Sequence, residues 1–421
     1  MANRLLGRLR EITKKTGIFE NSATSVAYHT GFLPFDYANG YIIQSRDDDE
    51  NLIAEYPNIG IMGGTFNTVV GKPGTAKTTA VVQWASAIVK PFENGFVVHI
   101  DLEQSTTITR LKNITGLTNK EFKDHYVLRQ EKAYIEDIFD MIKEVADEKE
   151  RYREDYMYIA PFRNEFGEEV KLFAPTIFII DSLPTLSPRP ESKKDKESGA
   201  MIEEQEITSG THAMRVARTL AEFYKKLMPI VKTYNISLFC INHINPKIDI
   251  NPFVKSQPQL LYLKTDEALP LGNTPIYYAN NVFKFVAKGT EKKCIEDDGF
   301  AGFGVEVQFL KSRSNVAGQF VHMIYDQNTG FDRARTLLEF IRENGCVLGA
   351  RKNARYFKDF PDIKFNEKEF TTEFYSRPEL RKAAMDTAMP FLEDKLSRVT
   401  PIDFQEDNFG IDVELMIKVC E

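Results

Sequence analysis

The sequence predicts an α/β fold with a mostly parallel central sheet, and three observations carry this prediction. Residues 69–80 (VVGKPGTAKTTA) read as a strand end, a Gly-rich loop and the first turn of a helix. The apolar runs 96–101 and 176–181 each close on an aspartate, as buried strands do at the ligand-binding edge of a parallel sheet. Amphipathic helical patterns at 133–150 and 211–234 alternate with these strands.

Composition bounds the class of protein. The chain has 421 residues, 42% of them hydrophobic, which is enough for a large core and two or three domains. The net charge of −7 leaves no overall basic field, so any nucleic acid must bind through local patches. The four cysteines lack metal-ligand spacing, which fits a reduced, cytoplasmic setting, and Cys240 reads as a small core residue. No run is apolar enough to be a signal peptide or membrane span.

The N-terminal residues form an amphipathic pattern. Leu5, Leu6, Leu9 and Ile12 recur at helical spacing, opposite arginines and lysines. A helix this short must dock on something, either its own domain or a neighbouring subunit, and we expect the neighbour. The predicted division of the chain is 1–27 as oligomerisation helix and tether, 28–345 as core, and 346–421 as a small C-terminal α+β region.

The remaining elements follow from periodicity and turn residues. Residues 30–40 (TGFLPFDYANG) read as a turn-rich segment, and 46–51 (RDDDEN) as a solvated loop. Further strands are expected at 125–129, 236–242, 280–287, 304–311 and 320–325, and further helices at 79–89, 333–344, 378–395 and 411–420. The stretches 187–210 and 244–275 show no periodicity and are expected to be irregular.

The Gly-rich loop has the residue types of a phosphate-binding P-loop. Gly71, Lys77 and Thr78 stand at its first, seventh and eighth positions. Backbone N–H groups converge on phosphate oxygens, Lys77 adds a point charge, and the Thr78 hydroxyl can ligate Mg²⁺. The sixth position is Ala76 instead of Gly, and we expect this small residue to enter the helix. The expected nucleotide-binding residues are Gly71, Lys72, Pro73, Gly74, Thr75, Ala76, Lys77, Thr78 and Thr79, with ATP and Mg²⁺ as ligands.

Acidic residues follow two of the predicted strands. Asp181 closes the strand 176–181, and we expect this strand to lie adjacent to the P-loop strand, with the carboxylate holding Mg²⁺ through water. Glu103 stands two residues beyond Asp101, at the end of the strand 96–101. The sequence therefore predicts a nucleotide site at one edge of the sheet.

The order of these segments resembles RecA-type recombinases, and is most similar to the UvsX recombinases of tailed phages. The segments that carry the resemblance are TGFLPFDYANG, FVVHIDLEQ, TIFIIDSLPTL, LFCINH, LGNTPIYYANNVFKF, FLKSRSN, IYDQNTGF and FTTEFYSRPELRKAA. Together they cover about residues 28–395. The resemblance implies a RecA-type P-loop ATPase core.

The resemblance also assigns roles around the phosphates. It implies that Lys77 and Thr78 bind phosphate and Mg²⁺, and that Asp181 holds the Mg²⁺ shell. Glu103 occupies the place of the catalytic glutamate that polarises the attacking water; the alternative is an ordinary acid at a helix N-terminus. His243 stands where RecA proteins have a glutamine that senses the γ-phosphate and where UvsX-like sequences carry His; the alternative is a structural histidine.

Three more residues receive roles from the resemblance. Tyr325 matches a residue that stacks on adenine, unless it is an ordinary core or cross-strand tyrosine. Lys311 and Arg313 match cations that reach the γ-phosphate of a neighbouring subunit's ATP. Their i, i+2 spacing would put both on one face of an extended strand; a solvated basic edge is the alternative.

The two irregular stretches fall where the family has its DNA-binding loops. Lysines with interleaved aromatic residues suit single strands, through phosphate contacts and base stacking. In 244–275 these lysines are Lys247, Lys255 and Lys264. The stretch 187–210 carries more acids than lysines, so we expect less DNA affinity from it.

The resemblance implies an ATP-dependent recombinase that forms helical filaments on single-stranded DNA and exchanges strands with double-stranded DNA. Single-strand-binding and mediator proteins would be its partners. A replicative ring helicase shares the P-loop and the Lys-x-Arg element, but some sixty residues before the P-loop leave little room for its usual N-terminal domain. A mediator that uses ATP as a structural clamp is the third possibility, and Glu103, Lys311 and Arg313 argue against it.

Overall fold

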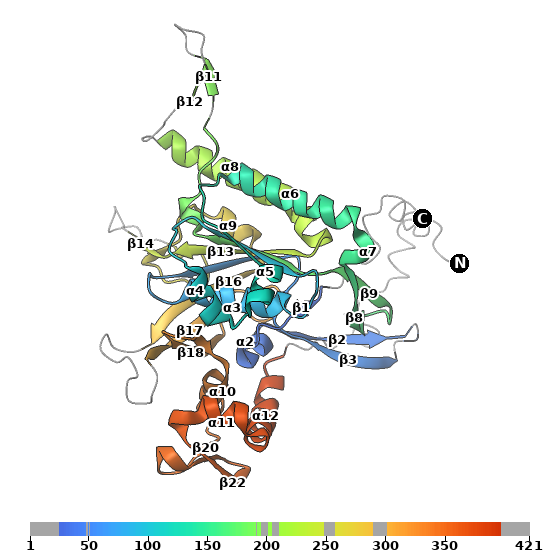
Figure 1. The fold of residues 1–421 in the computed structure, drawn as a ribbon, viewed down its shortest axis with the longest axis vertical. Coiled ribbons are helices and arrows are strands. Elements are labelled where there is room, and N and C mark those ends of the chain that lie inside the picture. The colour runs from blue at the N-terminus through green and yellow to red at the C-terminus, as the bar shows by residue number, and fades with distance from the viewer. Residues whose placement is uncertain are drawn as a thin grey trace, which may run out of the picture.

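A nine-stranded sheet forms the centre of the protein (Figure 1). The computed structural model describes residues 25–47, 49, 51–190, 192–194, 201–203, 210–247, 257–288 and 301–396. Across the sheet the strands are β19 (Gly330–Asp332), β18 (Phe320–Asp326), β17 (Gly302–Lys311), β16 (Asn281–Lys288), β5 (Phe66–Gly71), β13 (Ile236–His243), β10 (Thr176–Asp181), β6 (Phe96–Asp101) and β7 (Tyr126–Arg129). The six from β16 to β7 are parallel, and β17, β18 and β19 add an antiparallel edge. The predicted α/β fold with a mostly parallel sheet is confirmed.

Helices cover both faces of this sheet. One face packs against α3 (Lys77–Val89) and α4 (Ile108–Thr115), with α5 (Asn119–His125) beside them. The other packs against α6 (Ile135–Arg151) and α8 (Gly210–Thr233), which lie side by side in Figure 1. The central strands are apolar on both faces because both are buried in this way. Cys240, as expected, is a buried residue of β13.

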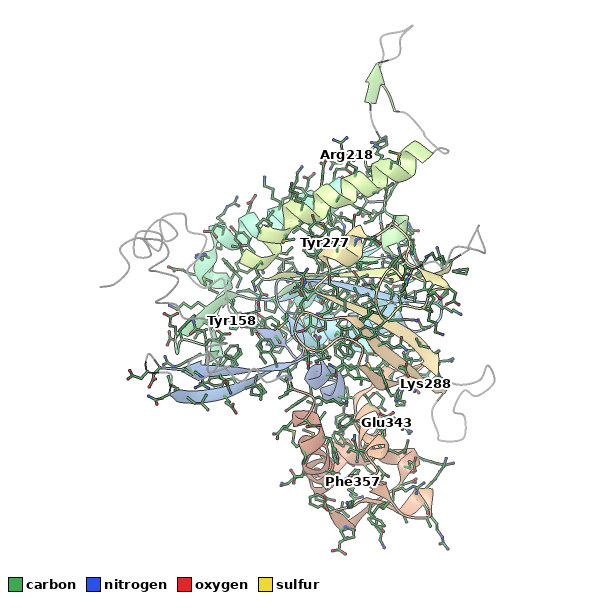
Figure 2. The ribbon with its side chains drawn as sticks, turned by 180° about the vertical axis from the view of Figure 1, so that it is seen from behind. Tyr158, Arg218, Tyr277, Lys288, Glu343 and Phe357 are labelled. Atoms are coloured by element: carbon green, nitrogen blue, oxygen red, sulfur yellow. The ribbon has the colours of Figure 1, made fainter. Side chains whose placement is uncertain are left out.

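The C-terminal region is built around an apolar cluster below the sheet (Figure 1), to which Tyr37 and Ile59 from the N-terminal part of the chain also contribute. It comprises α10 (Arg333–Glu343), β20 (Val347–Leu348), β21 (Arg355–Phe357), β22 (Phe360–Phe365), α11 (Phe370–Ser376) and α12 (Pro378–Glu393). Figure 2 shows Phe357 within this region and Glu343 nearer the sheet. The helix α10 packs on β18 as well as on α11 and α12, so it belongs to both the core and the C-terminal region. The predicted boundary at 345 stays a prediction.

Several short elements were not expected from the sequence. Residues 30–40 contain the helix α2 (Leu33–Ala38), whose buried Phe35 stacks on Trp84 with 4.4 Å between ring centroids. Residues 46–51 connect the hairpin β2 (Tyr41–Arg46) and β3 (Leu52–Asn58). Other unexpected elements are β4 (Ile61–Met62), which pairs with β1 (Ala27–Tyr28) in the stretch 24–29 that was expected to be extended, α7 (Arg153–Tyr156), β8 (Met157–Arg163) with β9 (Glu169–Phe173), and α9 (Thr274–Tyr278).

The two stretches expected to be irregular each hold a short β ladder. In 187–210, β11 (Ser192–Lys194) pairs with β12 (Met201–Glu203); in 244–275, β14 (Asn245–Pro246) pairs with β15 (Glu267–Ala268). The helix expected around Leu5 to Ile12 and the one expected at 411–420 lie outside the described residues. In the part of the chain that is described, no helix is both long and apolar enough to pass through a membrane.

Candidate nucleotide-binding site

The P-loop connects β5 to α3 and has the backbone that phosphate binding requires. A side chain at Gly71 would approach the carbonyl oxygen of Phe285 to 2.7 Å, so only glycine fits there. Gly74 has a φ of 78° and nothing within 4 Å of the position of a Cβ atom. Lys72, Pro73 and Gly74 are exposed at the tip of the loop. The tip therefore leaves space for a ligand above the N-terminus of α3.

Ala76 departs from the expectation that it enters the helix. It is the N-cap of α3 and has a φ of 60° and a ψ of 25°, in the left-handed region. This conformation costs an L-residue about 1–2 kcal/mol, which is why the P-loop pattern asks for glycine at this position. The loop geometry is kept in spite of the missing glycine, at a local cost in strain.

Lys77 is folded back onto the loop. Its side chain is buried, and Nζ donates to the carbonyl oxygens of Gly71 and Lys72, both at 2.9 Å. Burial lowers the pKa of Lys77, while the charges of Asp181 and Glu103 oppose this shift. The Thr75 hydroxyl also donates to the Lys72 carbonyl, at 2.9 Å. These bonds hold the lysine against the backbone of the loop.

The strand that ends at Asp181 is not adjacent to the P-loop strand, which corrects the sequence-based expectation. β13 lies between β5 and β10. The carboxylate still reaches the loop, because the hydroxyl of Thr78 donates to Asp181 Oδ2 at 2.7 Å. Thr78 and the following Thr79 are half-buried in the first turn of α3. The inserted strand brings a further residue, His243, to the same edge.

Burial is the main cause of the raised pKa of Asp181. It raises the pKa of this carboxyl to about 6, the charges of Glu103 and Asp101 add to the shift, and the Thr78 hydrogen bond and Lys77 oppose it. A cation at this position would relieve the repulsion among the carboxylates. Among the described residues, no group of three or more His, Cys, Asp or Glu side chains is arranged to hold a metal ion. The pair Thr78 and Asp181 fits Mg²⁺ of the kind that takes its other ligands from phosphate and water.

Glu103 lies between two polar partners at the same edge. Ser182 Oγ donates to Glu103 Oε1 at 2.6 Å, and His243 Nε2 is 3.4 Å from the same oxygen. The loop before it is fixed by buried Asp101, whose Oδ2 accepts from the Thr106 backbone N–H at 2.9 Å. Glu103 is therefore held as a positioned carboxylate and not as a free surface acid.

His243 connects this carboxylate to the P-loop strand. It closes β13 in register with Gly71. Its Nδ1 is buried and has no hydrogen-bond partner among the described residues. The ring thus joins Glu103 on one side and keeps one nitrogen available on the other.

Tyr325 lies near the end of β18, where it pairs with Phe303 of β17. Its ring packs against Phe331, with 5.3 Å between centroids, and the Phe331 backbone N–H donates to Gln83 Oε1 on α3 at 2.8 Å. Arg110 donates to the Tyr325 hydroxyl at 3.1 Å and to the Asn328 carbonyl oxygen at 3.1 Å. These contacts are those of a cross-strand tyrosine, and the adenine-stacking role stays a prediction.

Lys311 and Arg313 are at the other edge of the sheet. Phe285 of β16 pairs with Gly71, whereas Val282 pairs with Lys311, three residues or roughly 10 Å further along the strand. Lys311 Nζ donates to the Ile276 carbonyl oxygen at 2.8 Å and to that of Tyr277 at 3.0 Å. Burial, and then the charge of Arg313, lowers the pKa of Lys311 to about 8.

Arg313 shares the Tyr277 carbonyl oxygen, at 3.5 Å, so the two cations do lie on one side of the chain. The structure does not bring them to the P-loop of the same subunit.

The expected DNA-binding lysines follow His243 at the P-loop edge. Lys247 Nζ donates to the Gln257 carbonyl oxygen at 3.0 Å. Lys264 is exposed, close to the half-exposed ring of Tyr262 in sequence, and Lys255 lies outside the described residues. The positions of Lys247 and Lys264 are thus compatible with a DNA strand that runs past the loop after β13.

The sequence analysis assigned no specific role to four residues of this site, although Asp101 was expected at the ligand-binding edge of the sheet. Asp101 and Gln130 organise the Glu103 loop, Ser182 donates to Glu103, and Arg110 donates to Tyr325. The sequence does point to Ser182, because this residue directly follows Asp181. No local pattern points to Gln130 or Arg110, because only the fold brings them near the site. No protein-family model matches this chain, and no curated protein is significantly similar to it.

Proposed function

We propose that this chain is an ATP-dependent DNA recombinase of the RecA type, similar to the UvsX proteins of tailed phages. It would polymerise on single-stranded DNA, pair it with homologous double-stranded DNA, and hydrolyse ATP. The observation that carries the ATPase part is the cluster at one sheet edge. There the P-loop lysine, the 2.7 Å Thr78–Asp181 hydrogen bond and the positioned Glu103 lie together, because the charges of Asp181 and Glu103 act on Lys77.

Each residue of this cluster would have a different role in hydrolysis. Lys77 would exchange its carbonyl partners for phosphate oxygens, and Thr78 with Asp181 would hold Mg²⁺, which neutralises charge on the phosphates. Glu103, steadied by Ser182, would orient the attacking water and accept its proton. His243 contacts the same Glu103 oxygen, which suits a group that reports the state of the phosphates to the loop after β13.

The position of Lys311 and Arg313 supports hydrolysis between subunits. Since these cations lie at the edge opposite their own P-loop, they would serve the ATP of a neighbouring copy. Such cations contribute about 10³–10⁵ in rate in other phosphoryl-transfer enzymes. A head-to-tail contact of this kind generates a ring or a helical filament. It also makes hydrolysis depend on assembly.

The test is the ATPase rate with and without single-stranded DNA, joined to negative-stain images of the same samples. The proposal expects DNA-stimulated turnover and helical filaments. Closed rings would identify a helicase instead. Turnover that ignores DNA, with no assembly, would identify a mediator with a structural nucleotide.

A further inference from the structure

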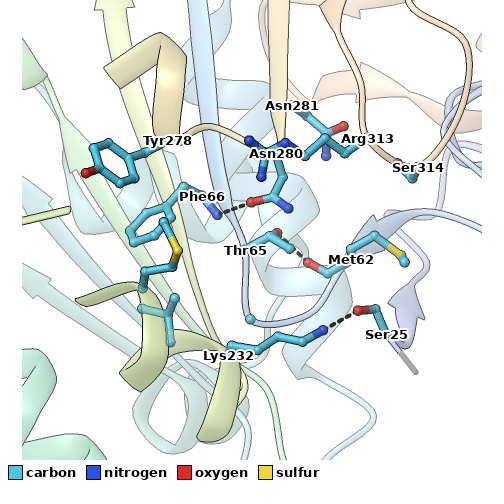
Figure 3. A pocket seen from close by; sticks show the side chains of 13 residues that line it. Ser25, Met62, Thr65, Phe66, Lys232, Tyr278, Asn280, Asn281, Arg313 and Ser314 are labelled. Atoms are coloured by element: carbon cyan, nitrogen blue, oxygen red, sulfur yellow. Dashed lines mark hydrogen bonds between the residues drawn. The ribbon is translucent and has the colours of Figure 1, made fainter. Parts of the chain in front are cut away.

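The side chain of Arg313 does little to hold itself in place. It is exposed, and among the described residues its one hydrogen-bond partner is the Tyr277 carbonyl oxygen at 3.5 Å, the long limit for such a bond. Figure 3 shows Arg313 and Ser314 beside a cavity of about 240 Å³, so there is open space next to the guanidinium. The position of Arg313 therefore depends on the backbone of its loop, residues 312–319, which we call the β17–β18 loop.

The residues on both sides of Arg313 are bonded to one oxygen atom. Ser312 Oγ and Ser314 Oγ both donate to Oδ1 of Asn39, the C-cap residue of α2, at 3.4 Å and 3.1 Å. Asn39 is fully buried, and its Nδ2 donates to the Gly60 carbonyl oxygen at 2.7 Å. Since that carbonyl needs a donor, the amide keeps its oxygen towards the serines. This buried amide thus fixes the loop immediately before and after Arg313.

The end of α2 holds the same loop at two further points. The carbonyl oxygen of Gly40 accepts from Asn315 Nδ2 at 2.8 Å, and that of Ala38 accepts from Gln319 Nε2 at 3.0 Å. Carbonyl groups at a helix C-terminus have no partners within the helix, and here the loop supplies them. We call residues 38–40 the α2 seat. Together with the two serines, four side chains of the loop bond to this seat.

The α2 seat belongs to the rigid core of the protein. The ring of Phe35 in α2 lies 4.4 Å from that of Trp84 in α3, 5.1 Å from that of Phe283 in β16 and 5.4 Å from that of Phe309 in β17, measured between centroids. All four rings are buried. The seat therefore fixes the β17–β18 loop relative to the sheet, and with it the backbone from which Arg313 projects.

We propose that Asn39 is a positioning residue, which acts through Ser312 and Ser314 to hold Arg313 where it reaches the ATP of a neighbouring copy. The role in hydrolysis rests on the function proposed above, whereas the seating of the loop requires no nucleotide chemistry. Without the seat, Arg313 would move between the adjacent cavity and solvent. Because a displacement of about 1 Å can cost about 10² in rate, loss of the seat should resemble a partial loss of Arg313.

The first measurement is limited digestion with trypsin, without ATP or DNA. Trypsin cleaves after arginine, and Asn39→Ala leaves the sequence around Arg313 unchanged. In the full chain, this variant should release the fragment that ends at Arg313 about tenfold faster than the native protein, because cleavage follows the population of the open loop and a lost hydrogen bond raises it by about that factor. Mass spectrometry identifies the fragment. An equal rate in both proteins would overturn the proposal.

The second measurement separates positioning from a general loss of stability. Asn39→Ala should bind a fluorescent nucleotide with native affinity and lose about 10² in DNA-stimulated turnover. Mixed with Glu103→Gln, it should recover activity, because it supplies an intact Glu103 site and its partner supplies a well-placed Arg313. Mixed with Lys311→Ala/Arg313→Ala, it should not recover, because neither copy supplies placed cations. If both mixtures behave alike while co-assembly is shown independently, Asn39 serves only the fold and the proposal is wrong.

A second variant is available if Asn39→Ala does not fold. Ser312→Ala/Ser314→Ala removes both donors from half-buried positions and should give the same pattern in the mixtures, whereas Ser312→Thr/Ser314→Thr keeps both hydroxyls and should keep native turnover. Ser376→Ala, which deletes an exposed hydroxyl on α11, is the matched control and should change neither measurement. Faster cleavage after Arg313, in a protein whose native form shows no DNA-stimulated ATPase, would overturn the proposed function alone.

Discussion

The two edges of the central sheet differ in their buried charged groups. At the P-loop edge, the charges of Glu103 and Asp101 act on the buried Asp181, and Asp181 and Glu103 act on the buried Lys77. At the opposite edge, Lys311 and Arg313 share one carbonyl oxygen, and burial lowers the pKa of Lys311. Each edge is therefore unfavourable by itself and complementary to the other. A head-to-tail stack of copies would satisfy both, which a contact between identical edges would not.

In the proposed function the two edges would have different roles: one would hold and hydrolyse the nucleotide, and the other would complete a neighbour's site. The largest expected effect tests the first role. Lys77→Ala should abolish both nucleotide binding and turnover, since it removes the buried cation of the loop. Glu103→Gln should spare binding and lower turnover by about 10²–10⁴, the usual contribution of a positioned base. Steady-state ATPase and titration with a fluorescent nucleotide separate these outcomes.

Lys90→Ala is the control for these variants, because Lys90 lies at the far end of α3 and pairs with Glu121. If the Glu103→Gln variant hydrolyses ATP at the native rate, Glu103 has no catalytic role.

A mixing experiment tests whether the opposite edge acts between subunits. Lys311→Ala/Arg313→Ala and Glu103→Gln should each lose about 10³ or more in turnover when alone. Mixed, they should recover activity, because one supplies an intact Glu103 site and the other supplies intact cations. ATPase measured across mixing ratios gives the result. If co-assembly is shown independently and no activity returns, the cations act within their own subunit or not at all.

The crowding of carboxylates should cost stability at the P-loop edge. Burial raises the pKa of Asp181 from 3.8 to about 6, so the folded state resists ionisation, and the penalty is absent below pH 3.8 and complete above pH 6. Asp181→Asn should therefore stabilise the nucleotide-free protein at pH 7.5, by on the order of 3 kcal/mol.

This gain should shrink as the pH falls through 6 towards 4, while Mg²⁺-dependent ATPase is lost at every pH. Denaturant melts at several pH values measure the stability. A variant less stable than the native protein at pH 7.5 would show that the Thr78–Asp181 contact outweighs the repulsion.

DNA binding should depend strongly on salt in spite of the acidic chain, because phosphate contacts release counterions. Lys255→Ala/Lys264→Ala should reduce the slope of log affinity against log salt by between about 1.4 and 2 units. Fluorescence anisotropy with labelled single strands measures this slope. Lys123→Ala, an exposed change on α5, should leave it unaltered. An equal slope in both variants would move the DNA path away from the P-loop edge.

The smallest effect concerns the backbone of the P-loop. Ala76→Gly should stabilise the protein by up to about 1 kcal/mol, because glycine adopts the φ of 60° without strain. Thermal melts measure the change, with Ala80→Gly in the same helix as a control that should destabilise by about 1 kcal/mol. Destabilisation by both changes would mean that Ala76 is not strained in solution.

Local patterns predicted the long elements well, and fold-level contacts account for what they missed. The expected ends of α3 and α10 lie within two residues of the structure, because amphipathic periodicity and caps are read from neighbouring residues. The short helix α2 escaped prediction because its stability comes from Phe35 on Trp84, 49 residues away.

In the candidate site, too, local patterns predicted some residues and contacts made by the fold account for the rest. The P-loop motif identified Lys77 and Thr78, whereas β13 between β5 and β10 was not foreseen, since sequence order does not give strand order. Gln130 reaches Asp101 only through the pairing of β6 with β7, which no local pattern encodes. The strain at Ala76 was likewise hidden until its φ was known.

The helix α10 decides where this chain can be cut. Leu337, Leu338 and Ile341 belong to the buried cluster of the C-terminal region, yet the same helix packs on β18 of the sheet. A fragment that ends at residue 345 would keep α10 and uncover this apolar side, and such surfaces promote aggregation. The two regions should therefore exchange amide hydrogens and unfold as one cooperative unit. A soluble, excisable module does not end at this helix.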